Sequence, residues 1–437
     1  MKKYLALILA LVMSLSLVAC GGSEGEGEGE GEATGSVYYL NFKPEADSAW
    51  QALAAEYTEA TGVPVKVVTA ASGEYETTLM NEMDKDAAPT LFQVNVGGLK
   101  TWGDYCYDLT GTDVVNELAA DGAVITKDNG EIASIAYCLE TYGIITNKAL
   151  LEQAGYSVSD IKDFASLKAI AEDIHARADE LGFDAFSSAG LDGSSSWRFS
   201  GHMASVALYY EFQKNNVSGM PATVTGEYVD NLKNLWDLYT TCSATTGAAL
   251  VTATGDASEA EFGQGKAVFF QNGSWEYNNL VLDASKGFNM NADDLTMIPL
   301  YIGVDGEEKA GLCSGTENYW AVNSTASEED IQATLDFLKW VVTSESGTTM
   351  MAEQFGASPF KSAKAQDNVF CKASDDMIAA GNYNIDWSFI YTPNTESWRA
   401  SVVDALTQYT VNGADWSTVK TAFVDAWARE YEAYNAQ

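Results

Sequence analysis

The stretch VYYLNF at Val37–Phe42 opens the part of the chain that decides the fold. Its β-branched and aromatic residues predict a buried strand. The apolar runs 63–68 and 90–94 predict two more strands, and the amphipathic stretches between the three runs predict helices. The order strand–helix–strand–helix–strand is typical of a mainly parallel sheet with helices on both faces. We therefore predict an α/β fold with a doubly wound sheet.

Polar and aromatic residues follow the first and third of these strands at the points where the strands end. In doubly wound sheets, ligands bind beyond the carboxyl ends of the strands. Amide, aromatic, cationic and carboxylate groups gathered there offer hydrogen bonds and an apolar surface. The candidate binding residues at this edge are Asn41, Phe42, Lys43, Glu45, Gln93 and Asn95. Lys43 either binds a ligand hydroxyl or neutralises Glu45.

The 437 residues predict two or three lobes, because a single core stops growing at about 250–300 residues. Further strands are predicted at 132–137, 143–146, 267–271 and 296–301, with a hairpin turn at Asp305-Gly306. Helical periodicity predicts helices at 148–154, 166–181, 200–210, 227–241, 275–282, 328–343, 345–355, 395–410 and 416–434.

The first 35 residues predict export and anchoring. Two lysines precede an apolar run, which is typical of a secretory signal peptide over residues 1–19. The sequence LVACG at 17–21 resembles a bacterial lipobox, which implies a diacylglycerol group on the Cys20 thiol. A plain signal peptide with a chance cysteine is the alternative. The Gly/Glu repeat in residues 20–35 predicts a flexible linker.

Composition excludes several classes of protein. The net charge of −38 disfavours nucleic acid and anionic lipid as partners. Only two histidines occur and no HExxH motif, which argues against a metalloprotease or a histidine-based triad, so we expect no catalytic residue, metal or cofactor. The remaining cysteines are far apart, odd in number and without a CxxC pair, and we interpret them as buried small hydrophobes: Cys106, Cys138, Cys242, Cys313 and Cys371.

Four motifs occur in order along the chain: ETYGIITNKALL at 140–151, FGQGKA at 262–267, NGSW at 272–275 and LKWVVTSE at 338–345. Their order and spacing resemble those of the extracytoplasmic solute-binding lipoproteins of carbohydrate ABC importers, family 1, the maltose/maltodextrin-binding type. Thr146 departs from that pattern, which usually has tyrosine there. The resemblance covers nearly the whole chain after Cys20.

This resemblance implies two α/β lobes joined by crossing hinge strands, with a ligand cleft between the lobes. It places residues 36–141 and 312–356 in the first lobe, and residues 142–311 and 357–437 in the second. It further implies a monomeric, non-enzymatic protein on the extracytoplasmic face of a bacterial cell membrane. Such a protein captures an oligosaccharide by lobe closure and delivers it to the permease subunits of an ABC importer.

A sugar site needs aromatic platforms for apolar faces and planar polar groups for hydroxyls. Loops and helix starts outside the first sheet offer both, in Trp197, Arg198, Trp275, Glu317, Trp387 and Trp398. Trp275 and Trp398 lie where the resemblance places stacking tryptophans. Glu140 lies at a crossover and either contacts the ligand or forms an ion pair in the hinge. Core packing is the alternative for each tryptophan, and the helical spacing of five others favours it: Trp50, Trp236, Trp340, Trp416 and Trp427.

Two other classes of protein stay open. A glycosidase also combines aromatic residues with paired carboxylates, and 62 acidic residues make chance pairs easy to find. A structural or adhesive surface lipoprotein would need no ligand. Within the binding class, a polyamine or a peptide is the alternative to a sugar.

Overall fold

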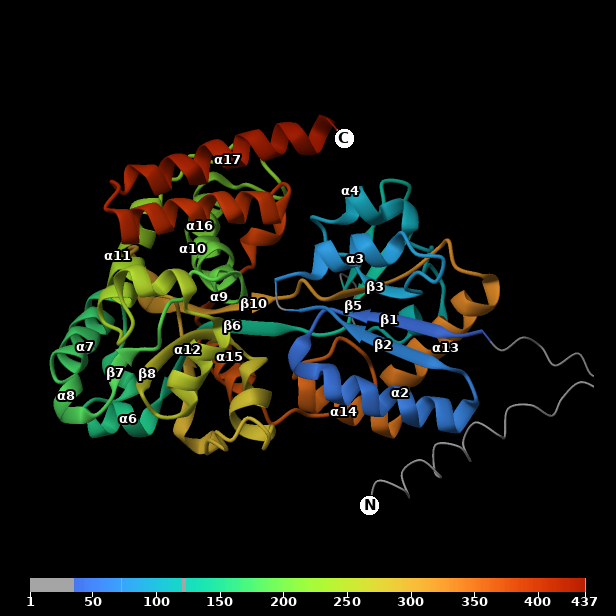
Figure 1. Cartoon of the computed structure of the whole chain (residues 1–437), viewed down its shortest axis with the longest axis horizontal. Helices are drawn as coiled ribbons and strands as arrows, with labels where there is room; N and C mark the ends of the chain where they lie inside the picture. The colour runs from blue at the N-terminus through green and yellow to red at the C-terminus, as the bar shows by residue number, and fades with distance from the viewer. Residues whose placement is uncertain (1–34, 72, 120–122, 437) are drawn as a thin grey trace, which may run out of the picture. The chain divides into compact units, whose positions relative to one another are not determined.

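The computed structural model describes residues 35–71, 73–119 and 123–436 (Figure 1). The signal peptide, Cys20 and almost all of the Gly/Glu linker lie outside the described residues, so the lipid anchor stays a prediction. The described chain forms two six-stranded sheets, each with helices packed against it. The α/β architecture that the sequence predicts is confirmed.

The first sheet has the strand order β2-β1-β3-β11-β5-β4. Its strands are β1 (Val37–Asn41), β2 (Val65–Thr69), β3 (Leu91–Gln93), β4 (Val124–Thr126), β5 (Ile132–Ala136) and β11 (Tyr319–Val322). Strand β1 pairs in parallel with both β2 and β3, as the strand–helix–strand pattern predicts. Strand β11 comes from far along the sequence and pairs antiparallel with β3 and β5.

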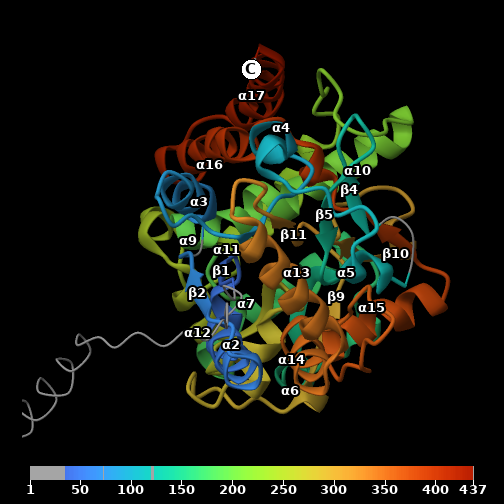
Figure 2. The same ribbon diagram turned by 90° about the vertical axis from the view of Figure 1, so that its right-hand side faces the viewer.

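Neighbouring residues of β1 serve the two faces of this sheet. Tyr39 packs on one face in a core formed with α2 (Asp47–Thr61), α13 (Glu328–Thr343) and α14 (Glu345–Phe355). Leu40 packs on the other face with α3 (Tyr75–Met83) and α4 (Leu99–Trp102). Figure 2 shows these helices around the first sheet. Alternation of side chains along a strand therefore buries both faces, as a doubly wound sheet requires.

The second sheet has the strand order β12-β10-β6-β8-β7, and β9 also pairs with β6. Its strands are β6 (Glu140–Asn147), β7 (Asp184–Phe186), β8 (Ala267–Gly273), β9 (Leu295–Ile298), β10 (Ala310–Gly315) and β12 (Tyr383–Ile385). The longer helices around it are α7 (Phe164–Ala176), α10 (Ala204–Asn215), α11 (Val229–Thr241), α12 (Gly255–Gly263), α15 (Val369–Ala379), α16 (Thr395–Asn412) and α17 (Ser417–Ala436).

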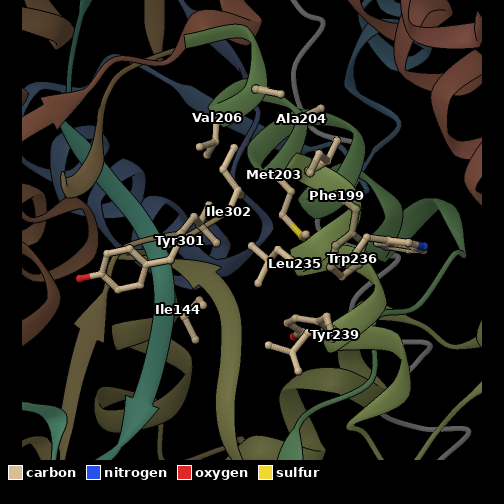
Figure 3. Close-up of a cluster of buried hydrophobic side chains, with 14 of the residues drawn as sticks. Ile144, Phe199, Met203, Ala204, Val206, Leu235, Trp236, Tyr239, Tyr301 and Ile302 are labelled. Atoms are coloured by element: carbon tan, nitrogen blue, oxygen red, sulfur yellow. The ribbon is translucent and has the colours of Figure 1, made fainter. Parts of the chain in front are cut away.

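Its core also has two sides. Ile144 of β6 packs in a large cluster with α7, α10, α11, α16 and α17. Figure 3 shows part of that cluster, where Phe199, Leu235 and Trp236 meet. The next residue of β6, Ile145, packs on the opposite side with side chains of α12 and α15.

The chain changes sheets in short segments. It leaves the first sheet after Ala136 and enters the second at Glu140, and it returns between Gly315 and Tyr319. Strand β10 thus keeps residues 312–315 in the second sheet, whereas the predicted boundary lies at 312. The segment after α14 stays close to the outgoing crossing, since the Leu139 N–H donates to the Ala357 carbonyl oxygen at 2.8 Å. The lobe boundaries themselves stay predictions.

The predicted helix 275–282 is confirmed over residues 276–282, where two α-helical residues lead into the π-helix η6 (Asn278–Leu282). The predicted hairpin is wrong. The turn at Asp305-Gly306 makes no hairpin, because β9 and β10 both pair with β6. Instead the buried Glu307 carboxylate accepts backbone N–H groups across this loop. Its donors are Phe164 at 2.7 Å, Ile302 at 2.8 Å, Gly303 at 2.8 Å and Val304 at 3.3 Å.

We predict that Glu307→Gln lowers the free energy of unfolding by about 2 kcal/mol, because the amide nitrogen would face N–H donors and hydrogen bonds to a charged group would be lost. Urea unfolding followed by circular dichroism measures this change. Glu308→Gln is the matched control, since Glu308 is the exposed neighbour. Equal stability of the two variants would show that the Glu307 carboxylate does not hold this loop.

Candidate functional site

A buried ion pair lies at the carboxyl end of β1. Lys43 Nζ is 2.8 Å from Glu140 Oε1 and 3.2 Å from Glu45 Oε1, and Lys43 and Glu140 are only 5% and 3% exposed. Glu140 Oε2 accepts a hydrogen bond from Asn318 Nδ2 at 2.6 Å. Burial alone would lower the pKa of Lys43, but the Glu140 and Glu45 carboxylates raise it above its usual value. The pair joins the end of β1 to the first residue of β6.

The ion pairs decide between the two roles predicted for Lys43 and between the two predicted for Glu140. Lys43 neutralises Glu45 and also pairs with Glu140, so the ion-pair interpretation holds for both Lys43 and Glu140. Asn41 is fully buried and holds the turn after β1: its Nδ2 donates to the Lys43 carbonyl and its Oδ1 accepts the Lys43 N–H. The predicted ligand contact of Asn41 is therefore wrong, because its side chain has no exposed surface.

Both polar atoms of the Gln93 amide form hydrogen bonds within the protein. Its Oε1 accepts from the Tyr137 hydroxyl at 3.2 Å and its Nε2 donates to the Glu317 carbonyl at 3.2 Å. Phe42, Glu45 and Asn95 are instead partly exposed at the same edge. These three side chains remain candidates for ligand contact.

A cluster of aromatic rings lies beside the Lys43 ion pair, on elements of the second sheet. The Trp197 and Trp275 rings are 6.0 Å apart and tilted, and both residues are partly exposed. Lys43 Nζ lies 5.4 Å from the Trp275 ring centroid, within reach of a cation–π interaction. Figure 1 shows α9 (Gly193–Trp197), which carries Trp197, at the end of the second sheet. The two partly exposed indoles adjoin a buried charge pair, which is the combination a polyhydroxylated ligand needs.

The position of Trp275 depends on the glycine of the NGSW motif. The Trp275 ring folds back over Gly273, where an added Cβ would lie 2.2 Å from the ring. Any larger residue at position 273 would therefore push the indole out of place. The glycine of the NGSW motif is therefore explained by the space that the Trp275 ring needs above it.

Trp387 supports this cluster from within the protein. It is 2% exposed, its indole N–H donates to the Cys313 carbonyl at 2.9 Å, and its ring lies 5.2 Å from that of Tyr142. The predicted ligand contact of Trp387 is therefore wrong, because packing against Gly315 and Tyr142 takes up its surface.

Trp398 and Arg198 are also core residues, which corrects two further predictions. Trp398 is fully buried on the inner side of α16, and its indole N–H donates to the Phe423 carbonyl at 3.0 Å. Arg198 is 1% exposed, and its guanidinium donates to the Gln271 and Ala189 carbonyl oxygens, each at 2.9 Å. Arg198 thus links the helical segment after Trp197 to β8 and makes no contact with solvent.

Two carboxyl groups near the cluster have raised pKa values. Burial raises the pKa of Glu317 to about 7, against the opposing effect of Arg399. Burial and the neighbouring Glu259 carboxylate raise the pKa of Glu276 to about 8. Asn279 Nδ2 lies between the Glu276 and Glu259 carboxyl groups and donates to both, at 3.3 Å and 3.2 Å. Glu276 follows Trp275 directly in the chain, so this carboxyl group lies in the loop that carries the ring.

Sequence reasoning missed several members of the site: Tyr142, His202, Glu276 and Asn318. The His202 ring stacks on Tyr142 with 3.9 Å between the ring centroids. No local sequence pattern predicts this contact, because Tyr142 lies on β6 and His202 on another element. The NGSW motif could have indicated Glu276, which follows it directly. Asn272 of the motif donates to Glu276 Oε1 at 2.7 Å. Asn318 follows Glu317 in the chain, and the sequence analysis named only Glu317 as a candidate.

The five cysteines predicted to be buried are buried and free. No group of three or more potential metal ligands occurs in residues 35–71, 73–119 and 123–436. Across the same ranges, no helix has the length and apolar character needed to cross a membrane.

The pKa of Glu276 predicts a specific pH dependence of stability. Between its ordinary value of 4.5 and about 8, the folded carboxyl keeps a proton that the unfolded chain has released, so stability falls as pH rises through this window. Glu276→Gln cannot ionise, and we expect it to match the wild type in Tm at pH 5 and to exceed it at pH 8.5. The exposed Glu308→Gln variant should show the wild-type profile. Parallel profiles of Glu276→Gln and wild type would contradict a buried, protonated Glu276.

Comparison with known proteins adds two findings. The chain matches the family model described as "Bacterial extracellular solute-binding protein" over residues 52–378. A search of curated proteins gave no match.

Solved structures share the fold at low sequence identity. The binding protein RafE in complex with raffinose has a TM-score of 0.71 at 15% identity, covering 91% of this chain and 99% of that chain. The GacH receptor of Streptomyces glaucescens, studied unliganded and with acarbose, has a TM-score of 0.66 at 17% identity, covering 92% and 100%. A sugar transporter protein of Bacillus licheniformis in complex with stachyose has a TM-score of 0.66 at 16% identity, covering 90% and 99%.

These matched proteins bind ligands and are not described as enzymes. The family match extends over most of the chain and through the crossings between the sheets, beginning after β1 and ending before β12. The chain belongs to the bacterial extracellular solute-binding protein family.

Proposed function

We propose that this protein binds a carbohydrate, an oligosaccharide in particular, and delivers it to the permease subunits of an ABC importer. The observation that carries the proposal is the pair of partly exposed indoles, Trp197 and Trp275, beside the Lys43 ion pair. Sugar rings have apolar faces that pack on indoles and hydroxyl groups that pair with carboxylates and amides. The fold neighbours named above, crystallised with raffinose, acarbose and stachyose, support the same class of ligand.

The mechanism we propose needs no catalytic residue. The first sheet offers Phe42, Glu45 and Asn95, and the second offers Trp197 and Trp275. A ligand that touches both groups favours the arrangement in which the lobes approach each other, by as much as its affinities for the two arrangements differ. Moving the ratio of closed to open protein from 1:99 to 99:1 takes about 5.5 kcal/mol of difference in ligand affinity between the two arrangements. The permease then recognises the loaded form by its surface.

The same proposal places the protein, as a monomer, on the outer face of the cell membrane through a lipid on Cys20, after release of residues 1–19. Wild type and Cys20→Ala expressed in a bacterial host test the anchor. Equal fractionation of both with the membrane, without lipid on either, would contradict it.

A thermal-shift panel with raffinose, stachyose, acarbose, chitin oligosaccharides and xylan oligosaccharides tests the ligand class. A binding sugar raises stability by about 2.7 kcal/mol at a hundredfold excess over Kd, which gives a clear rise in Tm. Chromatography of the recovered sugar should show it intact, whereas cleavage would identify a glycosidase. Scattering from the same sample should show a smaller radius of gyration with sugar than without.

We predict that Trp275→Ala weakens binding of the sugar with the largest shift by about 2 kcal/mol, on the scale of an aromatic hot spot. The fold should remain, because this ring is partly exposed. Isothermal titration measures the affinity and circular dichroism the fold. Trp398→Ala is the contrasting variant: its ring is fully buried, so it should lose about 3–5 kcal/mol of stability. Wild-type affinity of Trp275→Ala would remove Trp275 from the site.

A further inference from the structure

His202 lies at the centre of the aromatic cluster, on the π-helical segment η4 (Arg198–Met203). Its ring centroid is 3.9 Å from Tyr142, nearly parallel to it, and 5.0 Å from Trp197 and 5.4 Å from Trp275. It is therefore the one imidazole beside both partly exposed tryptophans, since the chain's other histidine, His175, pairs with Asp184.

One nitrogen of this ring is fixed by a neighbour on β8. Gln271 Nε2 lies 3.3 Å from His202 Nδ1. With the Gln271 amide nitrogen facing the ring, Nδ1 accepts this hydrogen bond and the ring proton is assigned to Nε2, while Gln271 Oε1 is left without a partner. Burial and the positive charges of Arg399, Arg198 and Lys43 hold the pKa of His202 well below its usual range, so the ring is neutral.

The other nitrogen has no partner within the protein. In the part of the chain that the structure describes, Nε2 of His202 has no hydrogen-bond partner, and it is not among the unpartnered polar atoms that are sealed from solvent. It is thus a neutral N–H donor at the edge of a ring that is only 3% exposed and packs beside Trp197 and Trp275. A hydroxyl oxygen is the acceptor that such a donor suits without a change in charge.

We propose that His202 is a binding residue whose Nε2–H donates a hydrogen bond to a hydroxyl of the carbohydrate packed against Trp197 and Trp275. This inference rests on the proposed function, since it needs a ligand with hydroxyl groups at this place. It deepens that function by assigning a directional donor to a site otherwise described by rings and carboxylates. A donor of fixed direction selects for the orientation of one hydroxyl group, which flat stacking surfaces do not.

The two histidines make a direct test by nuclear magnetic resonance possible. Protein labelled with ¹⁵N in histidine alone gives the ring signals of His202 and His175 and no others from side chains. We expect the His202 ring to remain the neutral Nε2–H tautomer from pH 5 to pH 8. Addition of raffinose, stachyose, acarbose or chitin oligosaccharides, whichever binds, should shift the His202 Nε2 signal and leave His175 unchanged. A cationic ring, a proton on Nδ1, or an unshifted His202 signal at saturation would overturn the proposal.

Two variants separate the hydrogen bond from packing. His202→Phe keeps a ring to stack on Tyr142 but has no donor, and we expect its affinity for the bound sugar to fall about five- to tenfold, the scale of one hydrogen bond. His202→Gln keeps an N–H donor and should recover part of that loss. His175→Gln provides the control, because it removes the chain's other imidazole, which pairs with Asp184, and should leave affinity unchanged.

The outcomes distinguish the two proposals. If the wild type binds a sugar and His202→Phe binds it as tightly, His202 is not a binding residue and the proposed function stands. If the wild type binds none of the sugars in the panel, the proposed function and this inference fail together.

Discussion

The site depends on the buried contact between Lys43 and Glu140. A lone ammonium or carboxylate at this depth would be costly, and each is tolerated only because the other lies 2.8 Å away and Asn318 and Glu45 share the remaining hydrogen bonds. Lys43 follows the first strand of one sheet, and Glu140 begins the central strand of the other. The pair therefore sets the position of the first sheet's binding edge relative to the strand that carries Tyr142, and through Tyr142 the aromatic cluster.

Local pattern explains which parts of the fold the sequence could predict. Helices α13 and α14 have the predicted bounds, because Ser327 and Ser344 cap them through side-chain hydrogen bonds that lie within three residues. Strands β10 and β11 were not predicted. They are short, contain glycine or are flanked by polar residues, and form only because distant strands pair with them. The hairpin at Asp305-Gly306 failed for the same reason: β6 competes successfully for both neighbouring strands.

The candidate site was harder to predict than the fold. A tryptophan at a helix start looks the same in sequence whether it faces a ligand or a core. Trp275 turned out partly exposed because its ring folds over Gly273, whereas Trp398 points into the space between α16 and α17. Of the charged candidates, Lys43 and Glu140 pair with each other, and Arg198 donates to backbone carbonyl oxygens. Three-dimensional partners decided these roles, and no spacing along the chain encodes them.

The glycines under the aromatic rings have a consequence for how binding specificity changes during evolution or engineering. Gly273 lies beneath Trp275, and an added Cβ at Gly315 would lie 2.9 Å from Trp387. A substitution at Gly273 would displace the partly exposed Trp275 ring, and one at Gly315 would displace the buried Trp387 ring, without a change of any aromatic residue. Positions 273 and 275 are therefore sterically coupled, as are 315 and 387. A mutant library that varies only the tryptophans would miss the variants in which the glycine changes as well. Paired randomisation of backbone glycine and ring is the route by which this scaffold could acquire a surface of different shape.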